Sequence, residues 1–574
     1  MPGLAQAPSR DSDTLALLGK KQVLKRRFGF WSLFGFAICE LITWETVLAL
    51  FSQSFDNGGP AGAVYGFIIA WSSTLSVYTV VSELASLAPI AGGQYYWVYM
   101  LAPEKYKVFS SYIVGWLTST AWVATVAIET IFAGTIMQGL IILDYSDYVP
   151  HEYQGMLMAW AIVATGIFIN AVTPGLLPKF EIFIIVFHIA GFIAVVATLW
   201  AMTPVRSTSA FVWTTSLNEG GWQTQGLSYC VGFLGNVATF VGADASVHLA
   251  EETENAGRNI PRAIIASMCV NGAVGFVMMV TILYNLGDVD SVLETATGYP
   301  FIQIFFNSTQ SVAGATVLGA VVLALTISCA VGIMTTASRM TWSFARDKGT
   351  PFSSWLSVVT GKKRVPVRAL CVACGFAAAL ALIYLGSYTV FNDVVSLTIS
   401  GFYLSYLIPA ALLLNHRIRG NIAAHKRVQI EGPGIEGYDP NIDEVPADST
   451  IVKKKDDNHD SKDSGDAIVP SGTQRRRSSV AQAQLMWGPF HLPGWFGIIN
   501  NAYACVYMVF VIFWSFWPPQ LDTNYENMNY SIVVLGGVII FSIIWYFVRG
   551  KKEYQGPTVD EEVEVIMRQA GAIR

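Results

Sequence analysis

The chain carries little charge for its size. Only 13% of its 574 residues are Asp, Glu, Lys or Arg, about half the share usual in soluble domains, whereas 53% are hydrophobic. One soluble core would not bury so much apolar surface. This composition excludes an ordinary water-soluble protein and predicts an all-α polytopic membrane protein.

Cysteines and targeting signals are also scarce. Seven cysteines, nearly all in apolar segments, predict buried thiols without a disulfide framework. Cys371 and Cys374 have CxxC spacing, but they lack a neighbouring His or a strand-helix context, so no redox centre, metal or cofactor is predicted. Residues 1–27 are polar and end in a basic triplet, which disfavours a cleavable signal peptide. The net charge of −5 is confined to tails and loops, and nothing supports nucleic-acid binding.

Long apolar runs dominate the chain instead. A helix needs roughly 20 such residues to cross a bilayer, and about twelve runs are long enough. They lie near 29–51, 60–85, 110–142, 154–173, 180–202, 226–250, 263–286, 313–338, 369–388, 394–414, 496–517 and 531–548.

The basic residues predict the orientation. With the N-terminus inside, only Arg206 of the 35 Lys and Arg residues falls in an outer loop, as the positive-inside rule requires. Both termini are therefore expected in the cytoplasm. Two glycosylation sequons begin at Asn307 and Asn529, and both fall in predicted outer loops, although Asn529 is close to the membrane.

Acidic residues interrupt two of the apolar runs. Glu45 lies in the middle of the first run with Glu40 five residues before it, and Asp244 lies in the sixth. An ionisable side chain at such depth is costly and marks a substrate or ion path. These positions predict a transporter and its binding site.

The two interrupted segments resemble each other weakly. Each has a polar interruption about ten residues after a Phe/Leu-Gly cluster, Leu33-Phe34-Gly35-Phe36 in one and Phe233-Leu234-Gly235-Asn236 in the other. They are five segments apart, as an inverted repeat with two broken helices requires. The predicted units are a tail (1–27), two five-helix repeats (28–203 and 226–414), an insert (415–493), two last helices (494–550) and a second tail (551–574).

Several motifs carry a family resemblance. They are Asn57-Gly58-Gly59-Pro60, Ser82-Glu83-Leu84-Ala85-Ser86-Leu87-Ala88-Pro89, Ala91-Gly92-Gly93-Gln94-Tyr95-Tyr96-Trp97, Asp244-Ala245-Ser246-Val247-His248-Leu249-Ala250-Glu251-Glu252, Asn259-Ile260-Pro261-Arg262 and Phe516-Trp517-Pro518-Pro519. Together they resemble the fungal amino acid/choline transporter family of the amino acid, polyamine and organocation superfamily. The resemblance implies a LeuT-like five-plus-five fold with two extra helices. It also implies secondary active uptake, by proton symport, of an amino acid, 4-aminobutyrate or a related amine across the plasma membrane.

The resemblance also assigns the binding residues. Thr43, Trp44, Glu45 and Thr46 correspond to the unwound part of helix 1, where relatives more often have a Gly-rich turn. Glu45 is expected to contact the substrate's ammonium group; the alternative is a neutral, internally hydrogen-bonded carboxyl.

The rest of the predicted site comes from other helices. Phe240, Gly242 and Asp244 correspond to the unwound part of helix 6, where an aromatic closes over the substrate and a carboxylate serves gating. Trp122 and Glu129 would complete the pocket wall.

Proton coupling is assigned to His188 together with Glu45 and Asp244. By position His188 resembles the site where proton-coupled relatives carry a lysine, and histidine titrates near neutral pH. A structural histidine is the alternative. Glu83 is expected to serve packing or gating.

Other functions compete with this one. Choline would favour an aromatic cage, for which Trp44, Phe240, Trp122 and Tyr403 are candidates. A non-transporting nutrient sensor would keep the same fold. A membrane acyltransferase would need a group such as His248 with nearby carboxylates, but we expect no enzyme.

The insert and tails point to regulation. Residues 415–493 are polar and Ser/Gly/Asp-rich in their central part, which predicts disorder. Ser478 and Ser479 follow three arginines, as in sites of basophilic kinases, although a basic run beside anionic lipid is an equal alternative. The expected partners are a small amine or amino acid, protons, membrane lipid, and kinase or ubiquitin-type regulators.

Overall fold

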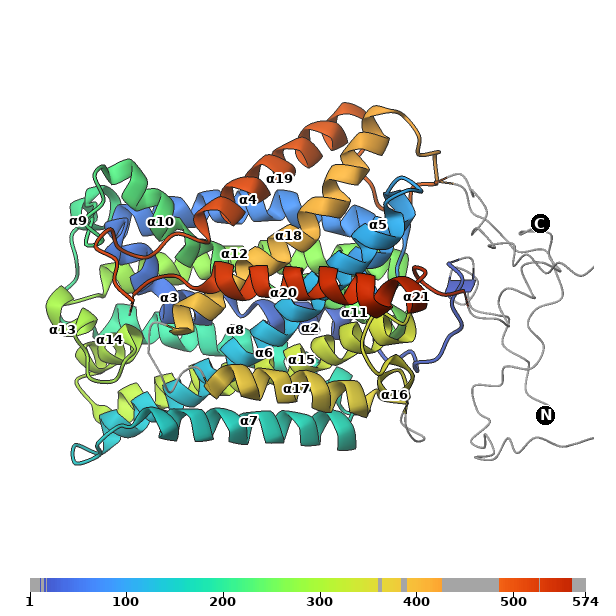
Figure 1. Ribbon diagram of the computed structural model, residues 1–574. Helices are drawn as coiled ribbons and strands as arrows, with labels where there is room; N and C mark the ends of the chain where they lie inside the picture. Colours follow the sequence, from blue (N-terminus) through green and yellow to red (C-terminus); the bar gives the residue numbers. More distant parts are fainter. Residues whose placement is uncertain are drawn as a thin grey trace, which may run out of the picture.

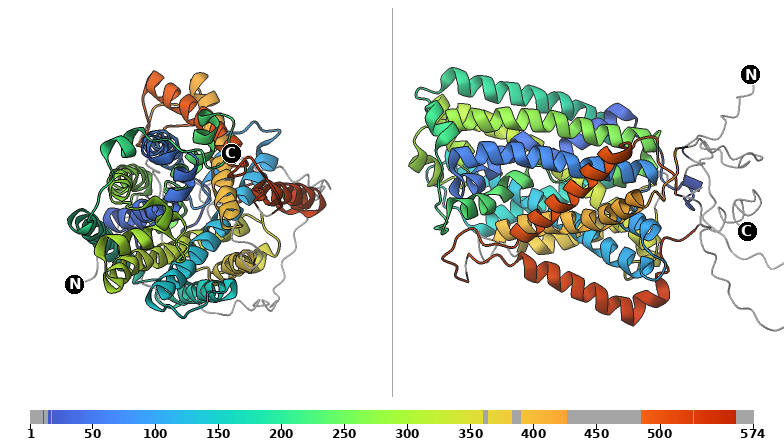
Figure 2. Two further views of the ribbon diagram at one scale, coloured as in Figure 1. Left: turned by 90° about the vertical axis from the view of Figure 1, so that its left-hand side faces the viewer. Right: turned by 90° about the horizontal axis from the view of Figure 1, so that it is seen from above.

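The protein is a bundle of helices, most of which share one direction while several cross it obliquely (Figure 1). The structure is a computed structural model that describes residues 11, 15, 16, 18–359, 364–382, 390–425, 485–525 and 527–559. Apart from two isolated bridges, these residues contain no β-structure. The predicted all-α class is confirmed, and a turned view shows the helices end-on around a filled centre (Figure 2).

Within the described residues, twelve helical segments occupy the predicted positions. The first five are α2 (Phe30–Leu41) with α3 (Thr43–Asp56), α4 (Gly59–Leu87), α6 (Lys107–Asp144), α7 (Glu152–Val172) and α8 (Leu177–Met202). The next five are α10 (Gln225–Ala238) with α11 (Ala245–His248), α12 (Ala256–Tyr284), α15 (Val312–Arg346), α17 (Val367–Ala381) and α18 (Val390–Ile418). The last two are α19 (Gly494–Trp514) and α20 (Ser531–Trp545).

Ten of these segments are long and apolar enough to cross a membrane. The sixth fails this criterion because it is broken between α10 and α11, and the ninth because α17 has only 15 residues. Short elements connect the segments: α5 (Gln94–Leu101), α9 (Ser209–Thr214), η1 (Ala250–Glu252), α13 (Val289–Leu293), α14 (Pro300–Thr309), α16 (Ser353–Leu356), η3 (Tyr546–Gly550) and α21 (Lys551–Glu553).

The two halves repeat the same order of elements in opposite directions. Each half begins with a broken segment, continues with a 29-residue helix, α4 or α12, and then has its longest helix, α6 or α15. A short helix precedes the long one in each half, and α5 and α14 lie at opposite ends of the bundle (Figure 1). This arrangement is an inverted repeat.

The two breaks touch each other. The first break is the single residue Ile42, whose φ of 29° is strained for a β-branched side chain. The second spans residues 239–244 and contains Gly242 at φ 116°. A Cβ on Gly242 would lie 3.0 Å from the Glu40 carbonyl oxygen, so glycine permits this close approach.

One sequence-based expectation about the first break is wrong. Thr43, Trp44, Glu45 and Thr46 are not unwound; they form the first turn of α3. Ile42 is the one residue between α2 and α3 that departs from helical backbone angles. The Thr46 N–H already donates to the Ile42 carbonyl. These four residues therefore lie at a helix N-terminus, where the first N–H groups lack partners within the helix.

The bundle end beside Lys20, Asp347 and Thr558, which we call the terminal face, is closed by buried charges. Lys20 forms an ion pair with Asp347, and both side chains are almost fully buried. Tyr95 donates to the same carboxylate at 2.7 Å, and the Thr558 N–H and hydroxyl donate at 3.0 Å each. Segments from both ends of the chain thus meet at the end of α15.

A second contact ties the two broken segments together at this face. Phe28, just before α2, pairs with Thr253 in a parallel bridge, and the Arg27 N–H donates to the Glu252 carbonyl at 2.8 Å. Arg339 binds the Glu252 side chain at 2.8 Å. The start of α2 is therefore fixed to the loop that follows the second break.

Two predicted modification sites differ in their surroundings. The Asn529 side chain is buried and donates to the Ser515 and Trp517 carbonyls at 2.9 and 3.1 Å. Its amide is engaged in the fold, so the expected glycosylation there is not supported. Asn307 lies near the end of α14 and is only partly buried.

The predicted insert begins and ends in folded structure. Ala423 pairs with Met486 in a parallel bridge, so the chain leaves and returns at one point. Residues 426–484, with Ser478 and Ser479, lie outside the described residues.

The ion pair that closes the terminal face is expected to weaken at low pH. Burial alone would raise the pKa of Asp347, but the Lys20 ammonium and Arg346 guanidinium overcome it and hold this pKa below its usual value. The ion pair therefore stabilises the fold fully above the unfolded pKa of about 3.9 and loses its contribution only as pH falls through the lower folded value.

We expect Lys20→Met to lower the free energy of unfolding by about 3 kcal/mol at neutral pH, because a buried carboxylate loses its main counter-charge. The thermal unfolding midpoint of the purified protein measures this. Lys25→Met, at an exposed lysine, is the control. Equal midpoints for the two variants would contradict the role given to Lys20.

Candidate functional site

A buried carboxylate-imidazole pair lies just after the first break. The Glu45 Oε1 and His188 Nδ1 atoms are 2.8 Å apart, and both side chains are fully buried. Glu45 is in the first turn of α3 and His188 is near the middle of α8. The Trp44 ring covers the imidazole with 5.8 Å between ring centroids. The sequence had predicted that both residues take part in proton coupling, but it could not predict that they are in contact.

Three more carboxyl groups lie near this pair. Glu40, at the end of α2, and Glu181, in α8, are buried, and neither has a nitrogen or oxygen partner for its carboxyl oxygens. Glu129, in α6, is partly buried and has one such oxygen. Glu40 is within electrostatic range of both Glu181 and Glu129, and Glu129 is within range of Glu45. Glu181 was missed from the sequence because it lies at the edge of an apolar run, although an acidic residue there is the same signal that identified Glu45.

The carbonyl groups beside the first break have partners from other segments, although the Ile38 carbonyl also accepts from the Ile42 N–H at 3.2 Å. The Asn271 side chain of α12 donates to the Ile38 carbonyl at 3.3 Å. The Cys329 thiol of α15 lies 3.8 Å from the Glu40 carbonyl oxygen. The Thr43 hydroxyl, at the N-terminus of α3, is buried without a partner. The break therefore offers a helix N-terminus and an unpaired hydroxyl on one side and carboxyl groups on the other.

Asp244 occupies a different environment from Glu45. Gln94 of α5 donates to one of its oxygens at 2.7 Å, and the Tyr406 hydroxyl of α18 donates to the other. Tyr78 accepts from the Gly242 and Ala243 N–H groups at 3.1 and 3.3 Å. Both carboxylate oxygens of Asp244 are thus engaged, and the second break is held to α4, α5 and α18.

The four predicted aromatic residues do not pack directly on one another. Phe240 packs on Phe67 with centroids 4.9 Å apart, and Trp122 packs on Phe402 at 4.9 Å. Tyr403 packs on Tyr406 and Tyr507. Among the ring contacts of the described residues, none joins two of the four proposed cage residues.

The group proposed for an acyltransferase is committed to other contacts. His248 Nδ1 is 2.8 Å from the Ala91 carbonyl oxygen, and its Nε2 lies 3.6 Å from an Asp244 carboxyl oxygen. Arg346 binds Glu251 through two hydrogen bonds of 2.6 and 2.9 Å, and Glu252 binds Arg339. Glu83 is likewise bound, by Arg417 at 2.7 Å. These side chains close the terminal face.

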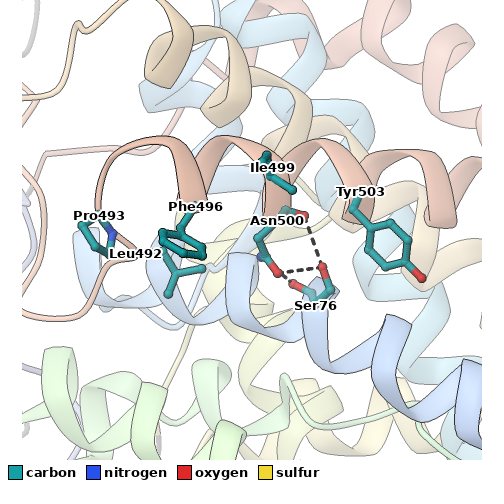
Figure 3. A pocket seen from close by; sticks show the side chains of 7 residues that line it. All are labelled: Ser76, Leu492, Pro493, Phe496, Ile499, Asn500 and Tyr503. Carbon is teal, nitrogen blue, oxygen red and sulfur yellow. Dashed lines mark hydrogen bonds between the residues drawn. The ribbon is translucent and has the colours of Figure 1, made fainter.

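One pocket on the outside of the bundle is separate from the breaks (Figure 3). It has a volume of about 380 Å³ and lies between α4 and α19. Ser76 and Asn500 hydrogen bond to each other in its wall at 2.9 Å, while Phe496 and Ile499 are more than half exposed. None of the predicted site residues lines this pocket, so we place the functional site at the breaks.

The Glu45–His188 contact is testable by a double-mutant cycle on stability. We expect His188→Gln and Glu45→Gln each to destabilise the fold, because each leaves a buried polar partner unpaired. The double variant should recover part of the loss, with a coupling of about 1 to 3 kcal/mol, measured as free energy of unfolding. Strictly additive effects would show that the two side chains do not interact.

Comparison with known proteins identifies the family of this chain. A model of the family described as amino acid permease matches residues 28–539. A putative amino acid/polyamine transporter of Macrophomina phaseolina is 31% identical over 70% of this chain and 87% of its own length. A choline transporter of Saccharomyces cerevisiae is 28% identical over 92% of this chain and 83% of its own.

One solved structure is less similar. A nucleobase-cation-symport-1 family transporter in a closed conformation is 15% identical, with a TM-score of 0.47 over 71% of this chain and 83% of that one, a likeness that by itself establishes no common fold. The family match covers nearly the whole helical bundle, so this chain belongs to the amino acid permease family and is an integral membrane transporter.

Proposed function

We propose that this secondary transporter imports an amino acid, 4-aminobutyrate or a related amine together with protons. The observation that carries the proposal is the buried Glu45–His188 pair at the first helix break. A break in a membrane helix is tolerated where it faces protein or a cavity, and here both breaks face each other in the bundle centre.

The charges around the break favour a cargo with an ammonium group. Glu45, Glu40 and Glu129 surround the first break, and His188 is the basic partner of Glu45. A cationic amine would balance the remaining negative charge. A carboxylate on the same cargo would suit the N-terminus of α3, where N–H groups lack partners and the helix dipole is positive.

His188 gives the pair its proton-binding capacity. Imidazole is the side chain whose ordinary titration falls nearest neutral pH. In the low dielectric of the bundle, a proton on His188 turns the hydrogen bond between a neutral imidazole and the Glu45 carboxylate into an ion pair. Arrival of a cargo ammonium beside Glu45 competes with that ion pair, which links cargo binding to proton movement. Asp244, with both oxygens already bound, would serve to hold the second break and to gate it.

Choline or another quaternary amine is the second candidate cargo. The similarity to a choline transporter favours it, whereas the N–H groups at the N-terminus of α3 suit a carboxylate, which choline lacks. We also propose that the chain is a carrier and not an enzyme, because His248 and its neighbouring carboxylates are bound at the terminal face. The alternative from another class of function is a nutrient sensor that does not transport.

The proposal also includes the membrane in which the protein resides and how it is regulated. The charge distribution favours a cytoplasmic terminal face and the family resemblance favours the plasma membrane. Kinase or ubiquitin-type regulation would act on the polar insert and tails.

The test is competitive uptake into cells that express the chain at their surface, with labelled 4-aminobutyrate, choline and an amino acid mixture at two external pH values. We expect saturable uptake of an amine or amino acid that is faster at the lower pH. Glu45→Gln should reduce it at least about tenfold, the loss expected when one charge-assisted contact of about 1.4 kcal/mol or more is removed. Glu152→Gln, at an exposed position at the start of α7, is the matched control.

Each result has one meaning. Saturable choline uptake alone would replace the amino acid assignment. Absence of uptake of every tracer by protein at the surface would refute the carrier and favour the sensor.

A further inference from the structure

The carboxyl group of Glu181 has no role in the function described so far, and Glu40 has entered it only as one of the acidic groups around the first break. Glu40 is in the last turn of α2 and is 3% exposed, and Glu181 lies in α8 and is fully buried. All four carboxyl oxygens lack a nitrogen or oxygen partner. Buried carboxyl groups nearly always have such partners, so two adjacent exceptions need a physical explanation.

Small neighbouring residues leave room for the Glu40 side chain. Gly332 of α15 faces the Glu40 carboxyl, and any side chain there would collide with Oε1. From α2 itself, the Cys39 thiol faces Glu181. Gly35 allows α2 to approach the α8 backbone at Glu181 closely. The two carboxyl groups thus share a small-residue seam between α2, α8 and α15.

The titratable groups closest to the two carboxyl groups are acids and thiols. Glu40 interacts electrostatically with Glu181, Glu129 of α6 and Asp244 of the second break. Cys39 of α2 and Cys329 of α15 add two thiols, and each interacts electrostatically with Glu45. From α12, the neighbouring polar side chain is Asn271, which does not titrate. Two histidines face members of this set: His188 is bound to Glu45, and His248 Nε2 lies 3.6 Å from Asp244.

Two buried carboxyl groups without a counter-ion cannot both ionise without a large cost, so such a pair retains a proton. A metal ion is a poorer fit, because among the described residues no group of three or more His, Cys, Asp or Glu side chains is arranged to hold one. The chemistry of the seam is therefore that of proton binding.

The register of α8 relates this seam to the Glu45–His188 pair. Glu181 and His188 are seven residues apart, so they share one face of the helix about 10 Å apart along its axis. Glu181 faces α2, before the break, and His188 faces α3, after it. Glu181 is also closer to the start of α8. The seam thus lies between the Glu45–His188 pair and the terminal face.

We propose that Glu40 and Glu181 form a second proton-binding site, through which the proton coupled to transport passes between the Glu45–His188 pair and the terminal face. One proton leaves the imidazolium of His188, binds a carboxylate of the Glu40–Glu181 pair, and leaves that carboxyl group for water when the terminal face opens. The inference rests on the proposed proton coupling, but protonation of the pair can be measured without any cargo.

Infrared spectroscopy of the full chain in liposomes tests protonation directly. We expect a band from neutral carboxylic acid at neutral pH that decreases as pH is raised. Part of this band should be lost in Glu181→Gln and in Glu40→Gln, and retained in Glu104→Gln, a control at a surface position with 77% side-chain exposure. The same band in wild type and both test variants would show that the two groups are always ionised and would overturn the proposal.

Transport by the same liposomes separates coupling from a structural role. The tracer is whichever of labelled 4-aminobutyrate, choline or the amino acid mixture the wild type accumulates. A gradient of about one pH unit can drive about tenfold accumulation per proton. We expect Glu181→Gln to exchange labelled for unlabelled tracer at a rate within about twofold of wild type while its pH-driven accumulation is lost, and Glu181→Asp to restore accumulation.

Three results would contradict the proposal. Unchanged accumulation in Glu181→Gln would show that the pair is not on the proton path. Loss of exchange as well as accumulation, in both Glu181 variants, would show a structural role. Accumulation driven by sodium instead of pH would assign the coupling to another ion. If wild type transports no tracer, the proposed function fails, whereas the infrared result still decides whether the pair binds a proton.

Discussion

Every backbone polar group inside a bilayer must find its partner within the protein, and this constraint organises the centre of the bundle. A continuous helix meets it locally, but the breaks at Ile42 and at residues 239–244 do not. Groups at the breaks are contacted from across the bundle, the Glu40 carbonyl by the Cys329 thiol from α15 and the Gly242 N–H by Tyr78 from α4. The segments that carry the breaks must therefore lie in the middle, with the other helices around them.

The same low dielectric decides what the acidic residues can do. Glu45 is paired with His188, and Asp244 accepts from Gln94 and Tyr406. At the terminal face, buried carboxylates have Arg or Lys partners, as Glu251 does with Arg346. Glu40 and Glu181 lack such partners. The partnered carboxylates hold elements of the fold together, whereas the unpartnered pair lies between α2 and α8, beside the first break.

The sequence predicted those features that depend on composition along the chain. Apolar runs located the twelve segments, and the acidic residues Glu45 and Asp244 located the two breaks, because a charge in an apolar run is visible without any contact map. Contacts between distant segments were not predictable. The partner of His188 is 143 positions away, and the burial of Asn529 depends on carbonyl groups of the preceding loop. The error at Thr43 to Thr46 has a local cause, because the helix is interrupted at the single residue Ile42. Sequence patterns do not associate a β-branched residue with positive φ.

Helix α2 connects the proton-binding groups to the closure of the terminal face. Its first turn follows the bridge between Phe28 and Thr253, and its last turn carries Cys39 and Glu40 against α8 and α15. A helix of 12 residues is about 18 Å long and behaves as a rigid body. A change of charge at Glu40 or Glu181 alters the electrostatic energy of packing α2 against α8, and a rigid α2 cannot adjust at one end alone. Any resulting tilt must strain or release the bridge at Phe28. Protonation at one end of this helix and opening of the face at its other end are therefore mechanically linked.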